Sequence, residues 1–156
     1  MREYEGRPQG TGRRVAVVVS RFNEEVTSRL LDGALAALRA AGVAEDDLLV
    51  VRVPGAFELP FAASAVIEAE RVDAVVALGA VIRGETDHYD YVCEAAREGI
   101  LRVGLESGIP VTFGVLTCST EEQALARAGG AHGNKGADVA LDALRMADLL
   151  RGEGDE

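Results

Sequence analysis

Runs of apolar residues alternate with amphipathic stretches along most of the chain. Four runs rich in β-branched residues, at 14–20, 48–53, 72–78 and 111–117, predict buried strands. Apolar positions at helical spacing predict helices after Asn23, over 59–70, from His88 to about Leu105, from Ser119 to about Gly130, and after Asn134. The predicted order is therefore β-α-β-α-β-α-β-α-α.

This order favours a parallel sheet covered by helices on both faces, because strands that are apolar throughout must be buried on two sides. We expect an α/β fold, a flavodoxin-like three-layer αβα sandwich with a four-stranded parallel sheet. Residues 13–152 form a single domain in this interpretation. Residues 1–12 are polar and contain Gly and Pro, which is typical of a flexible arm, and residues 153–156 should fray.

Three local expectations follow from the residues at the ends of these elements. Asn23 and Asn134 are plausible helix caps, and Ser119 to Gln123 contains two overlapping capping boxes. Gly79 should mark the exit of the third strand, and His88 should lie one turn inside the next helix. In open parallel sheets, ligands bind beyond the carboxyl ends of the strands, so the turns that follow the strands are the candidate site.

Composition narrows the classes of function. The chain has 156 residues, of which 48% are hydrophobic, so it can bury a core without metal or disulfide staples. Its net charge of −10 argues against a nucleic-acid partner. The charge does not exclude a phosphorylated substrate, because one arginine can bind a phosphate within an acidic protein.

Other sequence signals point to a cytoplasmic protein without metal or cofactor. No leader and no apolar run of about 18 residues is apparent, so we expect neither a signal peptide nor contact with a membrane. Cys93 and Cys118 form no metal-binding pattern and are interpreted as reduced thiols. The phosphate-binding and dinucleotide-binding glycine motifs are also missing.

The most informative stretch is Gly-Ala-Val-Ile-Arg-Gly-Glu-Thr-Asp-His-Tyr-Asp-Tyr-Val-Cys, at 79–93. It joins a predicted strand to a predicted helix. Gly84 would let the backbone approach a ligand, and the amides of Glu85 and Thr86 would form an anion site at the helix mouth. His88 is a candidate for proton transfer, because histidine is the side chain most often used for that purpose near neutral pH. A lone histidine at a helix start is at least as often structural.

Other polar and aromatic residues also have ordinary explanations. Phe22 could stack on a planar ring or simply cover the core, and Glu58 could do no more than complement a helix dipole. Phe113 could be a core aromatic in a strand. Arg127 could complement the dipole at the end of its helix.

The stretch at 79–93 resembles the signature of the lumazine synthase family very closely. Ser-Arg-Phe-Asn at 20–23, the Pro-Gly-Ala-Phe-Glu-Leu-Pro turn at 54–60, Glu-Gln-Ala-x-x-Arg-Ala-Gly at 122–129 and Gly-Asn-Lys-Gly at 133–136 agree with it. The resemblance extends from Tyr4 to about Leu149. It implies a transferase of riboflavin biosynthesis, which condenses 5-amino-6-(D-ribitylamino)uracil with 3,4-dihydroxy-2-butanone 4-phosphate and releases phosphate and water.

The resemblance also implies roles for individual residues. His88 would carry protons, Phe22 would lie against the pyrimidine, and Glu58 would accept hydrogen bonds from ribityl hydroxyls. Arg127, with the amides around Glu85, would bind the phosphate. The other implied substrate-binding residues are Ala56, Phe57, Ala80, Val81, Ile82, Thr86, Lys135 and, from a neighbouring subunit, Phe113.

Members of the family form pentamers, and some pack pentamers into an icosahedral shell of 60 subunits that can enclose a riboflavin synthase. No insertion interrupts 128–136, and Tyr4-Glu5-Gly6 resembles an arm strand that pairs with a neighbour's sheet, so the resemblance favours the shell. Two alternatives stay open: a shell-forming or flavin-binding relative without activity, and a flavodoxin-type electron carrier. The electron carrier needs a phosphate loop, which Ser20 to Asn23 does not resemble.

Overall fold

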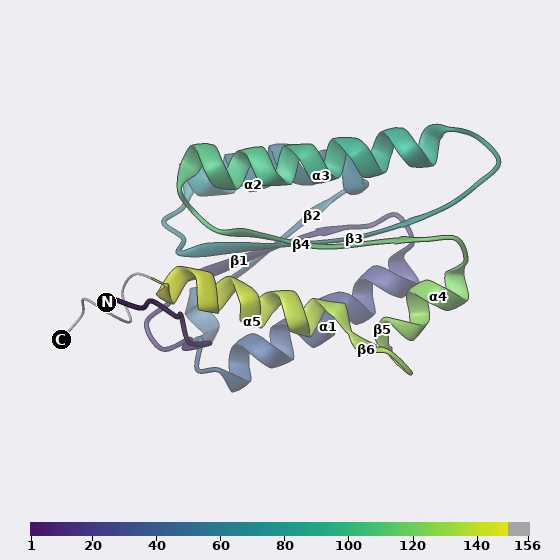
Figure 1. The fold of residues 1–156 in the computed structure, drawn as a ribbon. Helices are drawn as coiled ribbons and strands as arrows, with labels where there is room; N and C mark the ends of the chain where they lie inside the picture. Colours follow the sequence, from purple (N-terminus) through teal and green to yellow (C-terminus); the bar gives the residue numbers. More distant parts are fainter. Residues whose placement is uncertain (150–156) are drawn as a thin grey trace.

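The computed structural model describes residues 1–149, and its centre is a sheet of four parallel strands. These are β1 (Val15–Ser20), β2 (Leu48–Val53), β3 (Ala74–Ile82) and β4 (Val111–Cys118), in the order β2-β1-β3-β4 (Figure 1). Because every pairing is parallel, the carboxyl ends of all four strands meet at one edge of the sheet.

Two pairs of helices cover the two faces of the sheet. Helices α1 (Glu24–Ala40) and α5 (Lys135–Asp148) lie on one face, and α2 (Leu59–Ala69) and α3 (His88–Ser107) lie on the other (Figure 1). Successive side chains of β1 therefore enter different cores: Val15, Val17 and Val19 pack with α1 and α5, while Ala16 and Val18 pack with α2 and α3. The predicted three-layer α/β sandwich is confirmed.

The remaining elements are short. They are the 3₁₀ turns η1 (Glu45–Asp47) and η2 (Ala56–Glu58), helix α4 (Glu121–Ala126), and an antiparallel hairpin of β5 (Ala128–Gly130) and β6 (Gly133–Asn134). The hairpin was not predicted, because the sequence suggested a helix reaching Gly130. That helix ends at Ala126, and Gly129 and Gly133 take φ of 103° and 78°, a left-handed conformation that a helix cannot continue through.

The third strand is longer than predicted, because Gly79 lies inside it. A Cβ at Gly79 would come within 3.2 Å of both Leu59 Cδ1 and Ser20 Oγ. The glycine therefore lets α2 and β1 pack closely against β3 and does not end the strand. As a result β3 continues to Ile82, and its last residues project past the core.

Asn23 does not cap α1 with its side chain. It has a φ of 63°, and its Nδ2 donates a 2.8 Å hydrogen bond to the carbonyl oxygen of Ala80 on β3. It therefore ties the turn after β1 to the neighbouring strand end. Two other predicted caps are confirmed: Thr120 Oγ1 accepts from the Gln123 amide and Asn134 Oδ1 from the Ala137 amide. Of the two overlapping capping boxes, the one that begins at Ser119 does not form, because Thr120 is the cap and the Ser119 amide donates to Gln123 Oε1.

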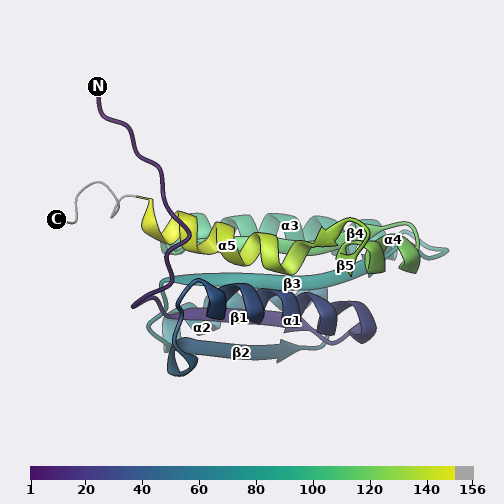
Figure 2. The ribbon, with the colours of Figure 1, turned by 90° about the horizontal axis from the view of Figure 1, so that it is seen from below.

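Part of the amino-terminal segment packs against the rest of the domain, and its first residues do not. Residues 1–12 form no strand within the single chain. Gly6 packs so tightly against the backbone of Arg145 that a Cβ would clash, and the Gly10 amide donates to the Ala41 carbonyl. The first residues before Gly6 then project away from the helices (Figure 2). The expected flexible arm is thus short, and a residue from the far end of the described chain holds its base.

That residue is Asp148, a buried carboxylate at the end of α5. Its two oxygens accept hydrogen bonds from the Arg7 amide at 2.8 Å and from the Arg13 guanidinium at 3.1 Å. The side chains of Arg13 and Asp148 are only 4% and 7% exposed. The Arg7 amide, followed by Arg13, holds the pKa of Asp148 below its ordinary value, although burial acts in the opposite direction.

We expect Asp148→Asn to lower the free energy of unfolding by about 3 kcal/mol at pH 7, because it leaves the Arg13 charge buried without its partner. Since the pKa of Asp148 is lowered in the folded protein, its stabilisation is present above the ordinary pKa near 3.8 and is lost as the pH falls through the folded value. The difference between the two proteins in chemical denaturation should therefore shrink below about pH 4. The matched control is Asp142→Asn, which removes an exposed carboxylate from the same helix and should have little effect.

Candidate active site

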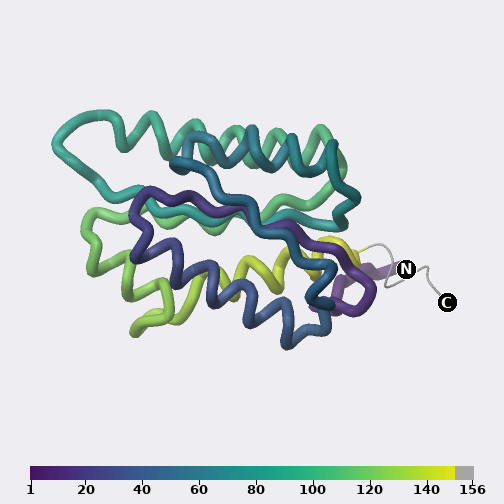
Figure 3. Tube along the Cα trace, turned by 180° about the vertical axis from the view of Figure 1, so that it is seen from behind, coloured from purple at the N-terminus to yellow at the C-terminus, as the bar shows by residue number. Residues whose placement is uncertain are grey.

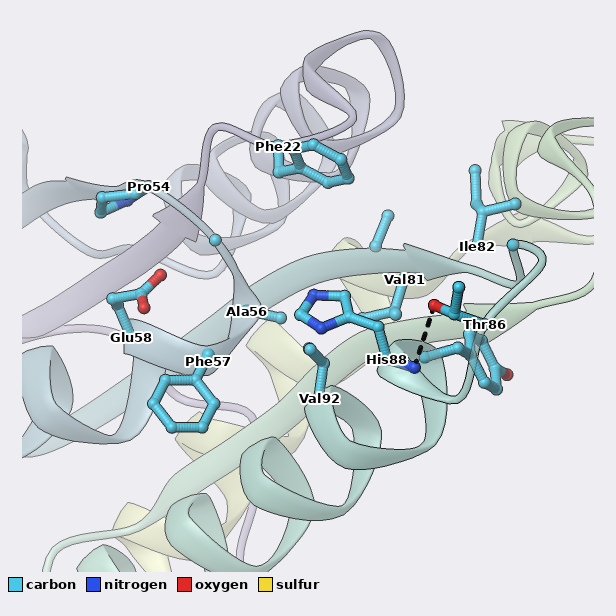
Figure 4. Close-up of a pocket in the computed structure, with 14 residues that line it drawn as sticks. Phe22, Pro54, Ala56, Phe57, Glu58, Val81, Ile82, Thr86, His88 and Val92 are labelled. Carbon is cyan, nitrogen blue, oxygen red and sulfur yellow. Dashed lines mark hydrogen bonds between the residues drawn. The ribbon is translucent and has the colours of Figure 1, made fainter.

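A cavity of about 670 Å³ opens at the carboxyl-end edge of the sheet, beyond β1, β2 and β3 (Figure 4). The turn after β1, the turn after β2, the end of β3 and the start of α3 each supply part of its wall. Its lining residues are Phe22, Pro54, Gly55, Ala56, Phe57, Glu58, Ala80, Val81, Ile82, Gly84, Thr86, His88, Tyr89 and Val92. The cavity is thus where parallel-sheet geometry predicts a ligand.

Two aromatic rings in this wall are largely bare. Phe22 is 69% exposed and Phe57 is 60% exposed, and they lie on different sides of the opening (Figure 4). A phenyl ring left in water in this way loses the free energy of burial and can recover it by stacking on a flat ligand. The carboxylate of Glu58 is the acidic group of this wall and can accept hydrogen bonds from hydroxyl groups.

His88 is the first residue of α3, and not one turn inside the helix as expected. Its imidazole points into the cavity between Ala56 and Val92 (Figure 4). Its amide donates a 3.3 Å hydrogen bond to Thr86 Oγ1, which orders the turn before the helix. The side chain is exposed and makes no hydrogen bond within residues 1–149, so both ring nitrogens are available to a ligand.

Tyr89 and Val92 complete the wall beside His88 and were missed from the sequence. Val92 follows His88 by four residues, so helical spacing alone places the two on one face. Burial, and then the nearby Cys93 thiol, raise the pKa of the Tyr89 phenol above its ordinary value. Burial likewise raises the pKa of Cys93, so both groups stay protonated near neutrality.

The structure brings together nine of the thirteen predicted site residues. Those nine are Phe22, Ala56, Phe57, Glu58, Ala80, Val81, Ile82, Thr86 and His88. Glu85 lies in the same loop but does not line the cavity. Phe113 lies half-buried on β4, where it packs against the core beneath α2 and α3.

Arg127 and Lys135 lie in a second cavity, of about 400 Å³, which shares no lining residue with the first. The end of β4, His132 and Asp138 complete its wall. The Lys135 amide donates to the Arg127 carbonyl at 2.8 Å, so the hairpin of β5 and β6 brings the two cations together. Arg127 Nη1 donates to the carbonyl of Gln123 at 2.9 Å, and neither cation has a carboxylate within 4 Å among the described residues.

Three further properties of residues 1–149 bear on the class of protein. No helix in this range has the length and apolar composition that crossing a membrane requires. No three His, Cys, Asp or Glu side chains in the same range lie together in a way that could hold a metal ion. Cys93 and Cys118 are both free thiols.

Comparison with known proteins decides the family. Residues 12–151 match the model of the 6,7-dimethyl-8-ribityllumazine synthase family. The chain belongs to this family. A relative from Gemmatimonas aurantiaca, named 6,7-dimethyl-8-ribityllumazine synthase, is 54% identical over 150 residues, which cover 96% of this chain and 92% of the relative. The resemblance seen in the sequence motifs is therefore confirmed, and the chain is a transferase of riboflavin biosynthesis.

Proposed function

We propose that the 670 Å³ cavity is where this chain condenses 5-amino-6-(D-ribitylamino)uracil with 3,4-dihydroxy-2-butanone 4-phosphate. The product of the family's reaction is 6,7-dimethyl-8-ribityllumazine, formed with loss of one phosphate and two waters. The observation that carries the proposal is the convergence of bare aromatic rings, the Glu58 carboxylate and the His88 imidazole on one cavity. A flat pyrimidine with a polyhydroxyl chain needs these groups.

The aromatic rings and the acid would hold the pyrimidine. Phe22 stacks on its ring, and Glu58 accepts hydrogen bonds from the ribityl hydroxyls. The apolar side chains at the end of β3 and Ala56 form the floor on which the ring rests. Holding two substrates in contact removes much of the entropic barrier to their reaction, so this binding is itself a large part of catalysis.

His88 would move the protons. The substrate amine attacks the ketone, and loss of water gives an imine. Removal of a proton from carbon then expels phosphate, and the second amine closes the ring with loss of the second water. Each step takes a proton from one atom and gives it to another. His88 suits this exchange because its imidazole faces the cavity, and an imidazole carries one nitrogen that can donate a proton and one that can accept it.

The phosphate would be bound by Arg127 and Lys135 of a neighbouring subunit. A planar guanidinium and an ammonium with no carboxylate within 4 Å among the described residues suit a phosphate dianion, although Asp138 lines the same cavity. They line a cavity that shares no residue with that of His88, which favours a site completed across an interface between subunits. Phe113, on the edge strand β4, would reach the same site from the neighbour.

Other exposed surfaces support assembly. Phe61 on α2 and Tyr91, Leu101 and Leu105 on α3 are each more than 60% exposed, although they are large and apolar. Leu101 and Leu105 line one cavity on α3, and exposed apolar side chains gathered in this way are typical of an interface. The projecting residues before Gly6 can pair with the open edge of a neighbour's sheet (Figure 2). We therefore propose a pentamer packed into a shell of 60 subunits, located in the cytoplasm, with room inside for a riboflavin synthase.

The reaction itself is tested by mixing the protein with both substrates and following the green fluorescence of the lumazine. We expect His88→Ala to lower kcat about tenfold, because proton transfer by a positioned group contributes ~10²–10⁴-fold and these substrates are already reactive. The side chain is exposed, so the thermal unfolding midpoint and the sedimentation coefficient should not change. Full activity would remove His88 from the mechanism, and failure to fold would assign it a structural role.

Arg127→Ala should raise KM for the butanone phosphate at least several-fold and leave KM for the pyrimidine unchanged, because only one substrate carries a phosphate. Mixed assembly then tests whether the site is shared. When His88→Ala and Arg127→Ala chains are refolded together in equal amounts, about one quarter of the sites should contain both wild-type residues and regain activity. The same chains refolded separately and then mixed are the control. If co-refolding gives no gain, Arg127 and His88 serve the same site from one chain.

Analytical ultracentrifugation at neutral pH tests the assembly. We expect one particle near the mass of 60 chains, because closed icosahedral symmetry satisfies every interface at once. Deletion of residues 1–5 should release pentamers if the projecting arm joins them, while the fold of each subunit remains. A wild-type species of five chains would exclude the shell and leave the shared active site intact.

A further inference from the structure

The loop that carries His88, residues 83–87, has few contacts with the rest of the molecule. It protrudes beyond the sheet between β3 and α3 (Figure 3). All five residues are exposed, and a Cβ at Gly84 would meet nothing within 4 Å. The Arg83 amide donates to the Cys118 carbonyl at 2.9 Å, which fixes only the start of the loop. Packing against the body therefore does not hold the rest of the loop.

The Arg83 side chain is what spans this loop. Its guanidinium carbon lies 4.3 Å from the centre of the Tyr89 ring, and its Nη2 lies 3.6 Å from Asp90 Oδ1. Tyr89 and Asp90 are the second and third residues of α3, directly after His88. Arg83, at the beginning of the loop, thus contacts the first turn of the helix at two points. These contacts connect the two ends of the loop through side chains.

We propose that Arg83 is a positioning residue for the reaction, which holds the first turn of α3 so that the His88 imidazole stays directed into the cavity. The inference rests on the proposed role of His88. Tyr89 is itself part of the cavity wall, so a cation on its ring fixes the wall and the histidine together. Without the contacts from Arg83 to Tyr89 and Asp90, His88 would still be the first residue of α3, but the first turn of the helix would fray, because its amide groups lack partners within the helix.

A direct role for Arg83 in binding phosphate fits the geometry less well. Arg83 does not line the cavity, although its neighbours Ile82 and Gly84 do. One face of its guanidinium is covered by the Tyr89 ring and one edge is directed to Asp90. A phosphate would have to compete with both groups. The two contacts are partly exposed and individually weak, so their loss should lower the occupancy of the productive arrangement without abolishing it.

The test compares steady-state kinetics of Arg83→Gln with those of the wild type. We expect kcat to fall about three- to tenfold, with KM for each substrate unchanged within about twofold. Asp90→Asn should give a smaller loss of the same kind, and Arg83→Lys should recover part of the rate, since lysine keeps the charge. Arg39→Gln is the matched control, because it breaks a closer exposed ion pair, with Glu45 at 2.7 Å, far from the cavity.

A double-mutant cycle separates positioning from an independent effect. In a His88→Ala background, Arg83→Gln should cause no further loss of kcat, because there is no imidazole left to position. A further loss as large as in the wild type, an unchanged kcat, or a selective rise in KM for the butanone phosphate would each overturn the proposal. If His88→Ala lowers kcat and Arg83→Gln does not, the positioning role of Arg83 is wrong and the proposed role of His88 stands. If His88→Ala is fully active, the proposed role of His88 fails, and the inference fails with it.

Discussion

Parallel pairing of four strands buried on both faces is the constraint on which the rest of this structure depends. It requires helices on each side, and it places every strand-to-helix turn at one edge of the sheet. Phe22, Glu58 and His88 are distant in sequence, yet each follows or adjoins a strand end and so lies at that edge. The strand order therefore determines where the cavity lies, and the side chains determine only what the cavity can bind.

Much of this arrangement could be predicted from local signals. Buried parallel strands are apolar throughout, so the run of valines was enough to predict β1. Thr120 and Asn134 predicted the starts of their helices, because a capping side chain bonds an amide in the next turn. The nine residues that share the cavity were predicted from the family resemblance, and the parallel strand order explains why they lie together. Local pattern sufficed wherever the deciding interaction was within a few residues.

Where the deciding interaction was distant, the sequence was insufficient. Gly79 looked like a strand exit, but Ser20 and Leu59 decide its role, and both are far away in the chain. Asn23 was predicted to cap α1, but its side-chain amide donates a hydrogen bond to the carbonyl of Ala80 on another strand. Glycines with left-handed φ turned the expected end of α4 into a hairpin. That Arg127 and Lys135 lie in a separate cavity depends on the same hairpin, which no periodicity could reveal.

Charge distribution reconciles an acidic protein with a phosphorylated substrate. Ten arginines of the described residues lie within 4 Å of a carboxylate, and Arg83 is one of them. Arg2, Arg52, Arg71, Arg127 and Lys135, the only lysine of the chain, have no such partner among the described residues, and of these Arg127 and Lys135 share one small cavity. The net charge of −10 repels polyanions over distances of about a Debye length, whereas the proposed site needs only this local pair to attract a single phosphate at contact. The proposed phosphate site would thus depend on this local pair of cations and not on the net charge, so that an acidic chain binds a small phosphate ester and still repels a nucleic acid.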